Sequence, residues 1–344
     1  MSDRSDLRGQ DPPALTAWLL ARGEEKYRAD QIIEAVHQRG VRAIDDLRQV
    51  PAPVRDQLAA AFFIGGETVE ARQESADGTV KLLLRLHDGE AVESVWIPDG
   101  ERATLCLSTQ VGCRMACRFC RTGAGGFTRQ LSAGEITGQV AAARAAFGRV
   151  TNLVVMGMGE PLDNLDHLLP ALRLLVHKKA YAFSPKKITV STVGLVAGIR
   201  RLLAEGPAVG LALSLHSALP KTRAELLPRA SRFDLCDLAA ALRDYGAAGR
   251  KTTIEVTLIE GVNDGAAEAR AVARFAASAG AKVNLIALNP APDLGFDPPL
   301  AGRVAAYREE VRKKGVDVFL RKSRGADILA ACGQLRGQEE KLER

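Results

Sequence analysis

The sequence has 344 residues, of which 47% are hydrophobic and 26% charged, which is enough to bury a large core in one large domain with a smaller partner. It has no apolar run approaching the roughly 20 residues of a membrane helix, and its polar start lacks the layout of a signal peptide. We therefore expect a cytoplasmic protein without membrane contact. Lysine and arginine number 47 against 41 aspartate and glutamate residues, and this mildly basic balance fits a polyanionic partner without requiring one.

The first part of the chain shows the spacing of amphipathic helices, with Leu15 and Leu19 in one stretch and Ile32 and Ile33 in the next. This pattern predicts a small helical domain over residues 1–65. Two strand-like runs then flank an Asp-Gly pair in VKLLLRLHDGEAVESVWIP, which is a strong short-range signal for a hairpin. We therefore expect a β-hairpin linker over residues 66–100.

After residue 100, strand-like runs alternate with amphipathic helical stretches. One of these stretches begins with Ser132 and Glu135 at the spacing of a capping box. Repeated strand-helix units predict an α/β domain with a parallel sheet, either open or curved into a barrel, over residues 101–335, followed by a solvated tail at 336–344. The strand-like runs are residues 104–109, 152–157, 187–192, 209–215, 253–259, 283–288 and 316–321.

In either architecture, ligands bind at the carboxyl ends of the parallel strands. The segments at these ends are rich in small and polar residues that suit contact with a ligand. We expect the ligand site to be assembled from these segments, which read GMGEP, STVG, SLHS, LNP and RKSRG.

Three cysteines, Cys113, Cys117 and Cys120, directly follow the first of these strands. Their spacing brings three thiolates to one side of a tight loop, where they can bind three irons of a cubane cluster and leave the fourth iron open. A structural zinc site normally has a fourth ligand, but the nearest histidines, His87 and His167, are distant in the sequence. The pattern therefore favours an iron-sulfur cluster over zinc, and either metal site over inert buried cysteines.

Further motifs follow one another along nearly the whole chain. They are YRADQI (27–32), RATLCLSTQVGC (102–113), GFTRQLSAGEI (126–136), VVMGMGEPLDN (154–164), ITVSTVGL (188–195), LSLHS (213–217), IEGVND (259–264), NLIALNP (284–290) and RKSRGADILAACGQL (321–335). With the three-cysteine spacing, these motifs resemble the RlmN/Cfr family of radical S-adenosylmethionine (SAM) RNA methyltransferases.

This resemblance implies a partial (β/α) barrel of the radical SAM type, with the small N-terminal helical domain and the β-hairpin linker attached. It implies a 4Fe-4S cluster on the three cysteines and SAM on the open iron. The implied reaction methylates an adenosine of RNA at carbon 2 or carbon 8. Either position is an electron-poor amidine carbon that does not attack a sulfonium methyl group, so the reaction requires a radical.

The resemblance assigns roles to two further cysteines. Cys332 matches the residue that carries the methyl group, and Cys106 matches the residue that releases the product through a transient disulfide. Without the resemblance, both would be interpreted as packing residues, and Cys236 is interpreted in that way. Glu93 matches the proton acceptor of the family, although its own surroundings predict a solvent-facing position on a hairpin strand.

The resemblance also implies a set of SAM-binding positions. Glu160 has a carboxylate that can accept from the amino group of SAM, Gly159 permits close approach of the backbone, and His216 is alternatively a core histidine. The implied positions are Gly159, Glu160, Ser191, Ser214, Leu215, His216 and Asn289.

RNA contact rests on the family and on clusters of basic residues, for which a solvated surface is the alternative. In the family the N-terminal helical domain helps to bind RNA, and we expect the same of residues 1–65. We expect ribosomal RNA as the substrate, with transfer RNA as a second one, an electron donor such as flavodoxin, and a monomer. The basic clusters are Arg312, Lys313 and Lys314; Arg321, Lys322 and Arg324; and Lys178, Lys179, Lys186 and Lys187.

Three functional hypotheses follow. The leading one is methylation at carbon 2 of an adenosine in 23S ribosomal RNA. The nearest alternative is methylation at carbon 8, which the same cysteines would serve. A third is a non-catalytic iron-sulfur protein that binds RNA as a sensor, which would need the cluster but would have no use for Cys106 or Cys332.

Overall fold

The structure, a computed structural model, describes residues 4–291 and 293–337. Its centre is a curved ten-stranded sheet with the order β14-β13-β12-β11-β10-β9-β6-β5-β4-β3. From β6 to β14 all neighbours are parallel, which confirms the predicted strand-helix units. The two edge strands, β14 and β3, do not pair, so the sheet is a partial barrel. The parallel strands are β6 (Arg102–Cys106), β9 (Asn152–Val155), β10 (Ile188–Thr192), β11 (Gly210–Ser214), β12 (Thr252–Leu258), β13 (Lys282–Ala287) and β14 (Val318–Leu320).

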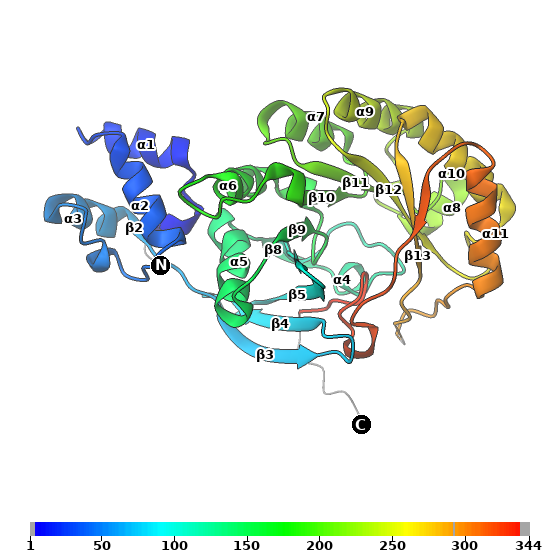
Figure 1. Cartoon of the computed structure of the whole chain (residues 1–344), viewed down its shortest axis with the longest axis horizontal. Coiled ribbons are helices and arrows are strands. Elements are labelled where there is room, and N and C mark those ends of the chain that lie inside the picture. Colours follow the sequence, from blue (N-terminus) through cyan, green and yellow to red (C-terminus); the bar gives the residue numbers. More distant parts are fainter. Residues whose placement is uncertain (1–3, 292, 338–344) are drawn as a thin grey trace.

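The longer helices of this domain cover the outer face of the curved sheet, whereas the short helix α4 (Arg121–Ala124) lies inside its curve (Figure 1). Ser132 and Glu135 form the predicted capping box, which fixes the start of α5. Strands covered in this way are buried on both faces. They therefore consist of apolar runs such as Leu211 to Leu213 and do not alternate between apolar and polar residues. The helices are α4 (Arg121–Ala124), α5 (Ala133–Phe147), α6 (Leu165–Val176), α7 (Val196–Glu205), α8 (Pro220–Leu226), α9 (Leu235–Ala247), α10 (Ala266–Ala279) and α11 (Ala301–Arg312).

The predicted hairpin is present as β4 (Val80–Arg85) and β5 (Ala91–Asp99), which pair antiparallel. A third strand, β3 (Thr68–Glu74), was not predicted, and it pairs with β4. Because β5 also pairs with β6, the three strands extend the main sheet. Two short strands, β7 (Gln110–Gly112) and β8 (Phe127–Gln130), form a separate pair beyond β6.

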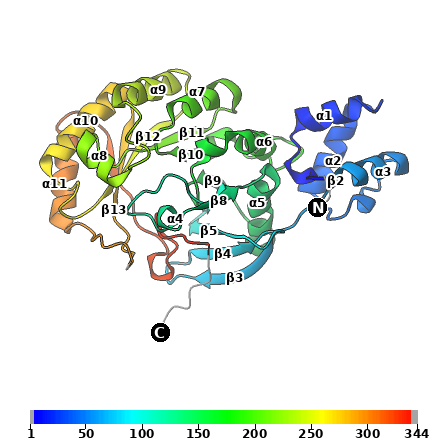
Figure 2. The same ribbon diagram turned by 180° about the vertical axis from the view of Figure 1, so that it is seen from behind.

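The N-terminal domain contains the predicted helices as α1 (Pro12–Leu20), α2 (Tyr27–His37) and α3 (Ala52–Ala61). Strand β1 (Ser5–Asp6) pairs with β2 (Phe62–Phe63) and closes the domain. Seen from either side, the domain lies next to α5 and α6 and far from α11 (Figures 1 and 2).

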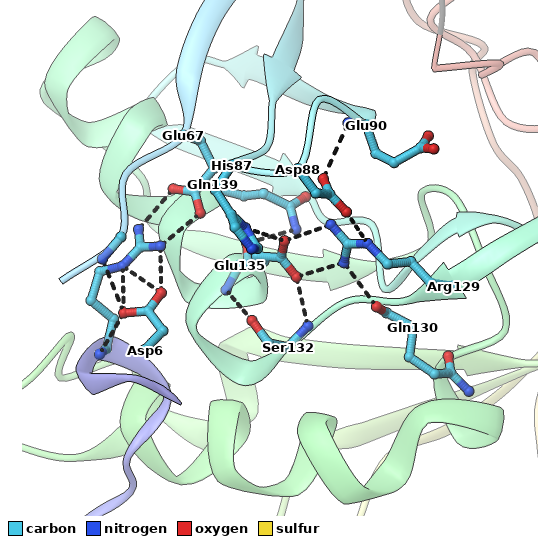
Figure 3. A network of polar contacts seen from close by, with 12 residues as sticks. Asp6, Glu67, His87, Asp88, Glu90, Arg129, Gln130, Ser132, Glu135 and Gln139 are labelled. Carbon is cyan, nitrogen blue, oxygen red and sulfur yellow. Dashed lines mark hydrogen bonds and ion pairs between the residues drawn. The ribbon is translucent and has the colours of Figure 1, made fainter. Parts of the chain in front are cut away.

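A buried ion network lies where this domain packs against α5 (Figure 3). The Arg8 guanidinium contacts Asp6 at 2.7 Å and Glu67 at 2.8 Å, and all three side chains are nearly inaccessible. The two carboxylates lie against glycines of α5: a Cβ at Gly138 would overlap the Glu67 carboxylate, and one at Gly134 would lie 2.5 Å from Asp6. The two glycines therefore allow the N-terminal domain to pack closely against the helix.

The last described stretch, residues 321–337, is called the C-terminal segment below. Its only regular structure is one 3₁₀ turn at Ala326–Ile328, and it crosses beside β3 and β4 (red in Figure 1). Asp327 holds it to the β3-β4 turn by accepting from the Ser75 hydroxyl at 2.6 Å. In the described part of the chain, none of the helices combines the length and the apolar character needed to cross a bilayer.

Candidate active site

Cys113, Cys117 and Cys120 lie in the loop between β7 and α4 and line one cavity of about 140 Å³. The loop folds tightly upon itself. Gly112 adopts a φ of +75°, and a Cβ there would overlap the Gly126 carbonyl, which accepts from the Cys113 amide at 2.6 Å. This close approach of backbone to backbone explains the glycine that directly precedes the first cysteine.

Burial makes the thiolate forms of these cysteines costly in the absence of a metal. Burial raises the pKa of Cys113 to about 12 and that of Cys117 well above its usual range, and the neighbouring thiolates act in the same direction. Burial thus favours the protonated thiols. Cationic iron atoms favour the thiolates instead, because thiolates are the ligands of an iron-sulfur cluster.

The arrangement fits a cluster better than a single ion. Within the described residues, no three His, Cys, Asp or Glu side chains converge closely enough to hold one metal ion. A cubane cluster has a different geometry, since each of its cysteines binds a different iron. The donor set therefore suits a 4Fe-4S cluster and argues against the zinc site considered from the sequence.

Glu160 lines the same cavity from the loop after β9. Its carboxylate accepts from the backbone amides of Val193 at 2.8 Å and Leu162 at 3.1 Å. Burial nevertheless raises the pKa of Glu160 to about 7. Gly159 beside it has a φ of +106°, and a Cβ there would lie 2.7 Å from Gln110, so only glycine fits. No cationic side chain in the described ranges pairs with Glu160, so its buried carboxylate suits the amino group of SAM.

Three more of the predicted SAM-binding residues line this cavity: Ser191, Ser214 and His216. The two serine hydroxyls lie 3.1 Å apart at the ends of β10 and β11. The His216 Nδ1 accepts from the Thr257 amide at 3.1 Å, and burial lowers the pKa of His216 to about 3. Its imidazole is therefore neutral with the proton on Nε2, which makes it a hydrogen-bond donor.

Leu215 and Asn289 lie elsewhere. The Leu215 side chain is fully buried in the core, and Leu215 does not line the cavity. Asn289 lines a second, adjoining cavity of about 570 Å³, where its Nδ2 donates to the Cys332 carbonyl at 3.4 Å. Asn289 also accepts from the Ser323 hydroxyl.

The second cavity brings together Cys106 and Cys332, which are far apart in the sequence. Cys332 is exposed in the C-terminal segment, so the interpretation as a buried helix-end cysteine is wrong. Cys106 is buried at the end of β6, and burial raises its pKa to about 12. Both are free thiols. Cys332 and Arg321 line both cavities, so the C-terminal segment lies where the two cavities meet.

Glu93 does not line either cavity. It is buried, so the solvent-facing interpretation is wrong. Its carboxylate forms an ion pair with Lys81 at 2.9 Å and accepts from the amides of Arg336 and Gly337 at 2.6 and 2.8 Å. In this structure Glu93 holds the end of the C-terminal segment.

The sequence analysis missed Glu255, which lines the first cavity from β12 and binds Arg321 at 3.1 Å. A charged residue inside the apolar run TIEVTLI was the signal that could have revealed it. Cys236 is exposed at the start of α9, so its interpretation as a packing residue is wrong. Its position in the first turn, where Asp234 caps the helix, keeps it outside the core.

The basic clusters have different surroundings. Arg321, Lys322 and Arg324 line the second cavity, and Arg102 joins them. The cluster at the end of α11 does not line either cavity, and Arg312 and Lys313 pair with Glu309 and Glu310, as expected of a solvated helix face. Lys179 pairs with Glu34 of α2 and so contacts the N-terminal domain.

Comparison with known proteins agrees with this geometry. The family model of the radical SAM superfamily matches residues 107–273, and that of the ribosomal RNA large subunit methyltransferase N-terminal domain matches residues 5–64. A crystal structure of a radical SAM methyltransferase from Sphaerobacter thermophilus is 40% identical, with a TM-score of 0.88, over 97% of this chain and 100% of that one. The fold and the cysteine loop thus define a radical SAM enzyme, which uses a 4Fe-4S cluster and SAM.

Curated relatives show to which family of radical SAM enzymes the chain belongs. The probable dual-specificity RNA methyltransferase RlmN of Gemmatimonas aurantiaca is 42% identical over 96% of this chain and 93% of its own length. The dual-specificity RNA methyltransferase RlmN of Syntrophobacter fumaroxidans is 42% identical over 94% of this chain and 95% of its own length. The chain belongs to the RlmN family of radical SAM RNA methyltransferases.

Proposed function

We propose that this enzyme methylates carbon 2 of an adenosine in 23S ribosomal RNA, and also in transfer RNA, through a methyl group carried on Cys332. One observation carries the proposal: Cys106 and Cys332 share a cavity that adjoins the one lined by Cys113, Cys117, Cys120 and Glu160. A methyl carrier has to reach SAM on one side and RNA on the other. The exposed Cys332, where the two cavities meet, is suited to that task.

The side chains have distinct roles in this proposal. Cys113, Cys117 and Cys120 hold the cluster, while Glu160 and His216 orient SAM. The Cys332 thiolate would take a methyl group from one SAM molecule, whose neutral thioether leaves, and would become a thioether itself. When bound, the reduced cluster and a second SAM molecule would supply radical chemistry at this methyl group. The Cys332 methylene would then bond to the adenine carbon, and the adduct would lose the ring proton and one electron to the oxidised cluster. Attack of the Cys106 thiolate on the Cys332 sulfur would form a disulfide and break the carbon-sulfur bond, whose electron pair would take up a proton to complete the methyl group of the released product.

A base has to remove the ring proton after the carbon-carbon bond forms, because only then does the ring regain aromaticity. We propose Glu93 for this role on the strength of the family motif. Its carboxylate is occupied by Lys81 and by two amides of the C-terminal segment. This role therefore requires the end of that segment to move away when RNA binds.

The basic mouth of the second cavity supports RNA as the substrate. Arg102, Lys322 and Arg324 provide positive charge around the cysteine pair, where phosphates next to the target adenosine would lie. Since its substrates are ribosomal and transfer RNA, we propose that the enzyme acts in the cytoplasm. We also propose that it acts as a monomer supplied with electrons by a donor such as flavodoxin.

The test begins with peptide mass spectrometry of enzyme incubated with SAM and an intact cluster. One added methylene mass on the Cys332 peptide is the expected result. The exposed Cys236 serves as the matched control, and it should stay unmodified. An unmodified Cys332 together with full cluster content would contradict the carrier mechanism.

The second stage is an anaerobic reaction on transcripts of 23S ribosomal RNA and transfer RNA. The nucleosides are then compared by chromatography with 2-methyladenosine and 8-methyladenosine. The 2-methyl isomer supports the proposal, and the 8-methyl isomer supports the alternative. If Cys117→Ala abolishes cellular function while Cys332→Ala leaves it intact, the sensor hypothesis replaces both.

A further inference from the structure

Helix α8 places a charged side chain, Arg223, deep in the wall behind the cysteine loop. Arg223 is only 1% exposed, which is rare for a charged side chain that lacks an ionic partner. No carboxylate lies within ion-pair distance of it in the part of the chain that the structure describes. A buried cation of this kind destabilises the fold unless a negative group is present nearby.

The hydrogen bonds of Arg223 leave its charge uncompensated. Its two terminal nitrogens donate to the Leu215 and Val193 carbonyls at 2.5 and 2.7 Å, at the carboxyl ends of β11 and β10. These acceptors are neutral. Its Nε is buried and has no hydrogen-bond partner. Hydrogen bonding therefore accounts for the position of the guanidinium but not for its charge.

The charge of Arg223 lies close to the first cavity, because its acceptor Val193 lines that cavity. Two groups of the site, Cys117 and His216, interact electrostatically with Arg223. Burial lowers the pKa of Arg223 to about 10. Arg223 thus remains protonated at neutral pH.

The medium between α8 and the cysteine loop is apolar. Leu226 and Leu227 pack in one buried cluster with Cys113, Cys117 and Phe119. The Arg118 amide donates to the Leu226 carbonyl at 3.1 Å, which fixes the loop on the helix. Charges interact more strongly across such a medium than across water. Arg223 itself does not line the cavity, so it acts on the cluster ligands through the wall and not on SAM directly.

We propose that Arg223 is a positioning residue that tunes the cluster. Its buried positive charge stabilises the electron that the cluster accepts from its donor, and it thereby raises the reduction potential of the cluster. Net charge and burial around a cluster are established determinants of this potential. The proposal concerns the cluster site alone, and it holds whichever adenine carbon is methylated and whether or not Cys332 carries the methyl group.

The test compares cluster-loaded full-length variants by redox titration monitored by electron paramagnetic resonance, without RNA. Arg223→Gln retains donors for the carbonyls but removes the charge. At a potential that half-reduces the wild type, we expect its ratio of reduced to oxidised cluster to fall by about tenfold or more, which corresponds to a shift of about 59 mV for a one-electron couple. Arg223→Lys retains the charge and should stay within about twofold of the wild type.

The matched control is Arg229→Gln. Arg229 is exposed, yet it donates to the Arg114 carbonyl of the same cysteine loop at 2.7 Å. Its charge is screened by solvent, so its removal should leave the ratio unchanged. Iron and sulfide content and thermal unfolding are measured for every variant.

A wild-type ratio in a fully loaded Arg223→Gln variant overturns the proposal. An equal fall in Arg223→Lys and Arg223→Gln also overturns it, since geometry and not charge would then be decisive. Arg223→Met, which buries no polar group, covers the case in which the glutamine variant does not fold. If Arg223→Gln and Arg223→Met fold but lose the cluster while Arg223→Lys keeps it, the requirement for charge is supported. If all three variants lose the cluster, the proposal is overturned.

Discussion

The cysteine loop and the C-terminal segment meet at one site but are built in different ways. Glu160 follows the core strand β9 and the cysteine loop follows the short strand β7, and backbone hydrogen bonds and burial fix both. The C-terminal segment has a single 3₁₀ turn, and contacts such as Thr122 to the Leu335 carbonyl at 2.6 Å hold it in place. Its cysteine, Cys332, is exposed. The difference teaches that, in the mechanism we propose, the cofactor is held by a loop fixed through its own backbone, and the methyl group is carried by an exposed cysteine on a segment held mainly by contacts with side chains of other elements.

The largest expected effect is on release of the methylated RNA from Cys332 in the C-terminal segment. Cys106→Ala removes the thiol that we propose attacks the Cys332 sulfur, while Cys332 and the cluster ligands remain. We expect turnover to fall to the level without enzyme and RNA to stay covalently attached to the protein. Denaturing electrophoresis with labelled RNA detects this adduct. Cys236→Ala is the control, and free methylated RNA from Cys106→Ala would rule out the assigned role.

The second effect tests how the C-terminal segment is held. Glu93→Gln breaks a buried ion pair and leaves the buried Lys81 without an ionic partner, so we expect a loss of about 3 kcal/mol in the free energy of unfolding. Urea unfolding measures it. Glu70→Gln on the same sheet edge removes one partner of an exposed pair with Arg85 and should cost at most about 1 kcal/mol. Equal losses would show that the segment does not depend on Glu93.

The third effect concerns the packing of the N-terminal domain against α5, away from the cysteine loop and the C-terminal segment. Gly138→Ala on α5 displaces the Glu67 carboxylate from Arg8, and we expect a loss of about 1–3 kcal/mol in stability. RNA methylation should fall, while methylation of Cys332 should be unchanged. Gly302→Ala on α11, where a Cβ meets nothing within 4 Å, should be neutral or stabilising. If Gly138→Ala impairs Cys332 methylation, the active site depends on docking of the N-terminal domain.

The smallest effect tests the cofactor side of the comparison, at Glu160. Because burial raises the pKa of Glu160 to about 7, its carboxyl is protonated below that pH and carries a negative charge only above it, and we propose that this charge binds the SAM amino group. Affinity for SAM should therefore fall about tenfold per pH unit below 7. Calorimetry on cluster-loaded enzyme between pH 6 and 8 measures this. Glu160→Gln should bind weakly with little pH dependence, and a wild-type profile that is equally flat would exclude this role.

Much of the fold followed from local patterns. The alternation of apolar runs and helical stretches predicted the parallel strands from β6 to β14, and the Asp-Gly pair predicted the hairpin. Strand β3 was missed because its residues are mostly exposed and polar, as in TVEARQE, so no apolar alternation marks it. Its pairing with β4 depends on an edge that exists only in the folded sheet.

The sequence by itself determined the class of enzyme, a radical SAM RNA methyltransferase, because the cysteine triplet, GMGEP and SLHS are short segments in which spacing and residue type carry the information. The tertiary structure alone decided that Cys106 lies across a cavity from Cys332, that Glu93 is buried with Lys81, and that Arg223 stands behind the cysteine loop. The physical reason is that burial and electrostatic environment depend on neighbours far away in the chain. Curvature of the sheet brings those neighbours together, and no local pattern records it.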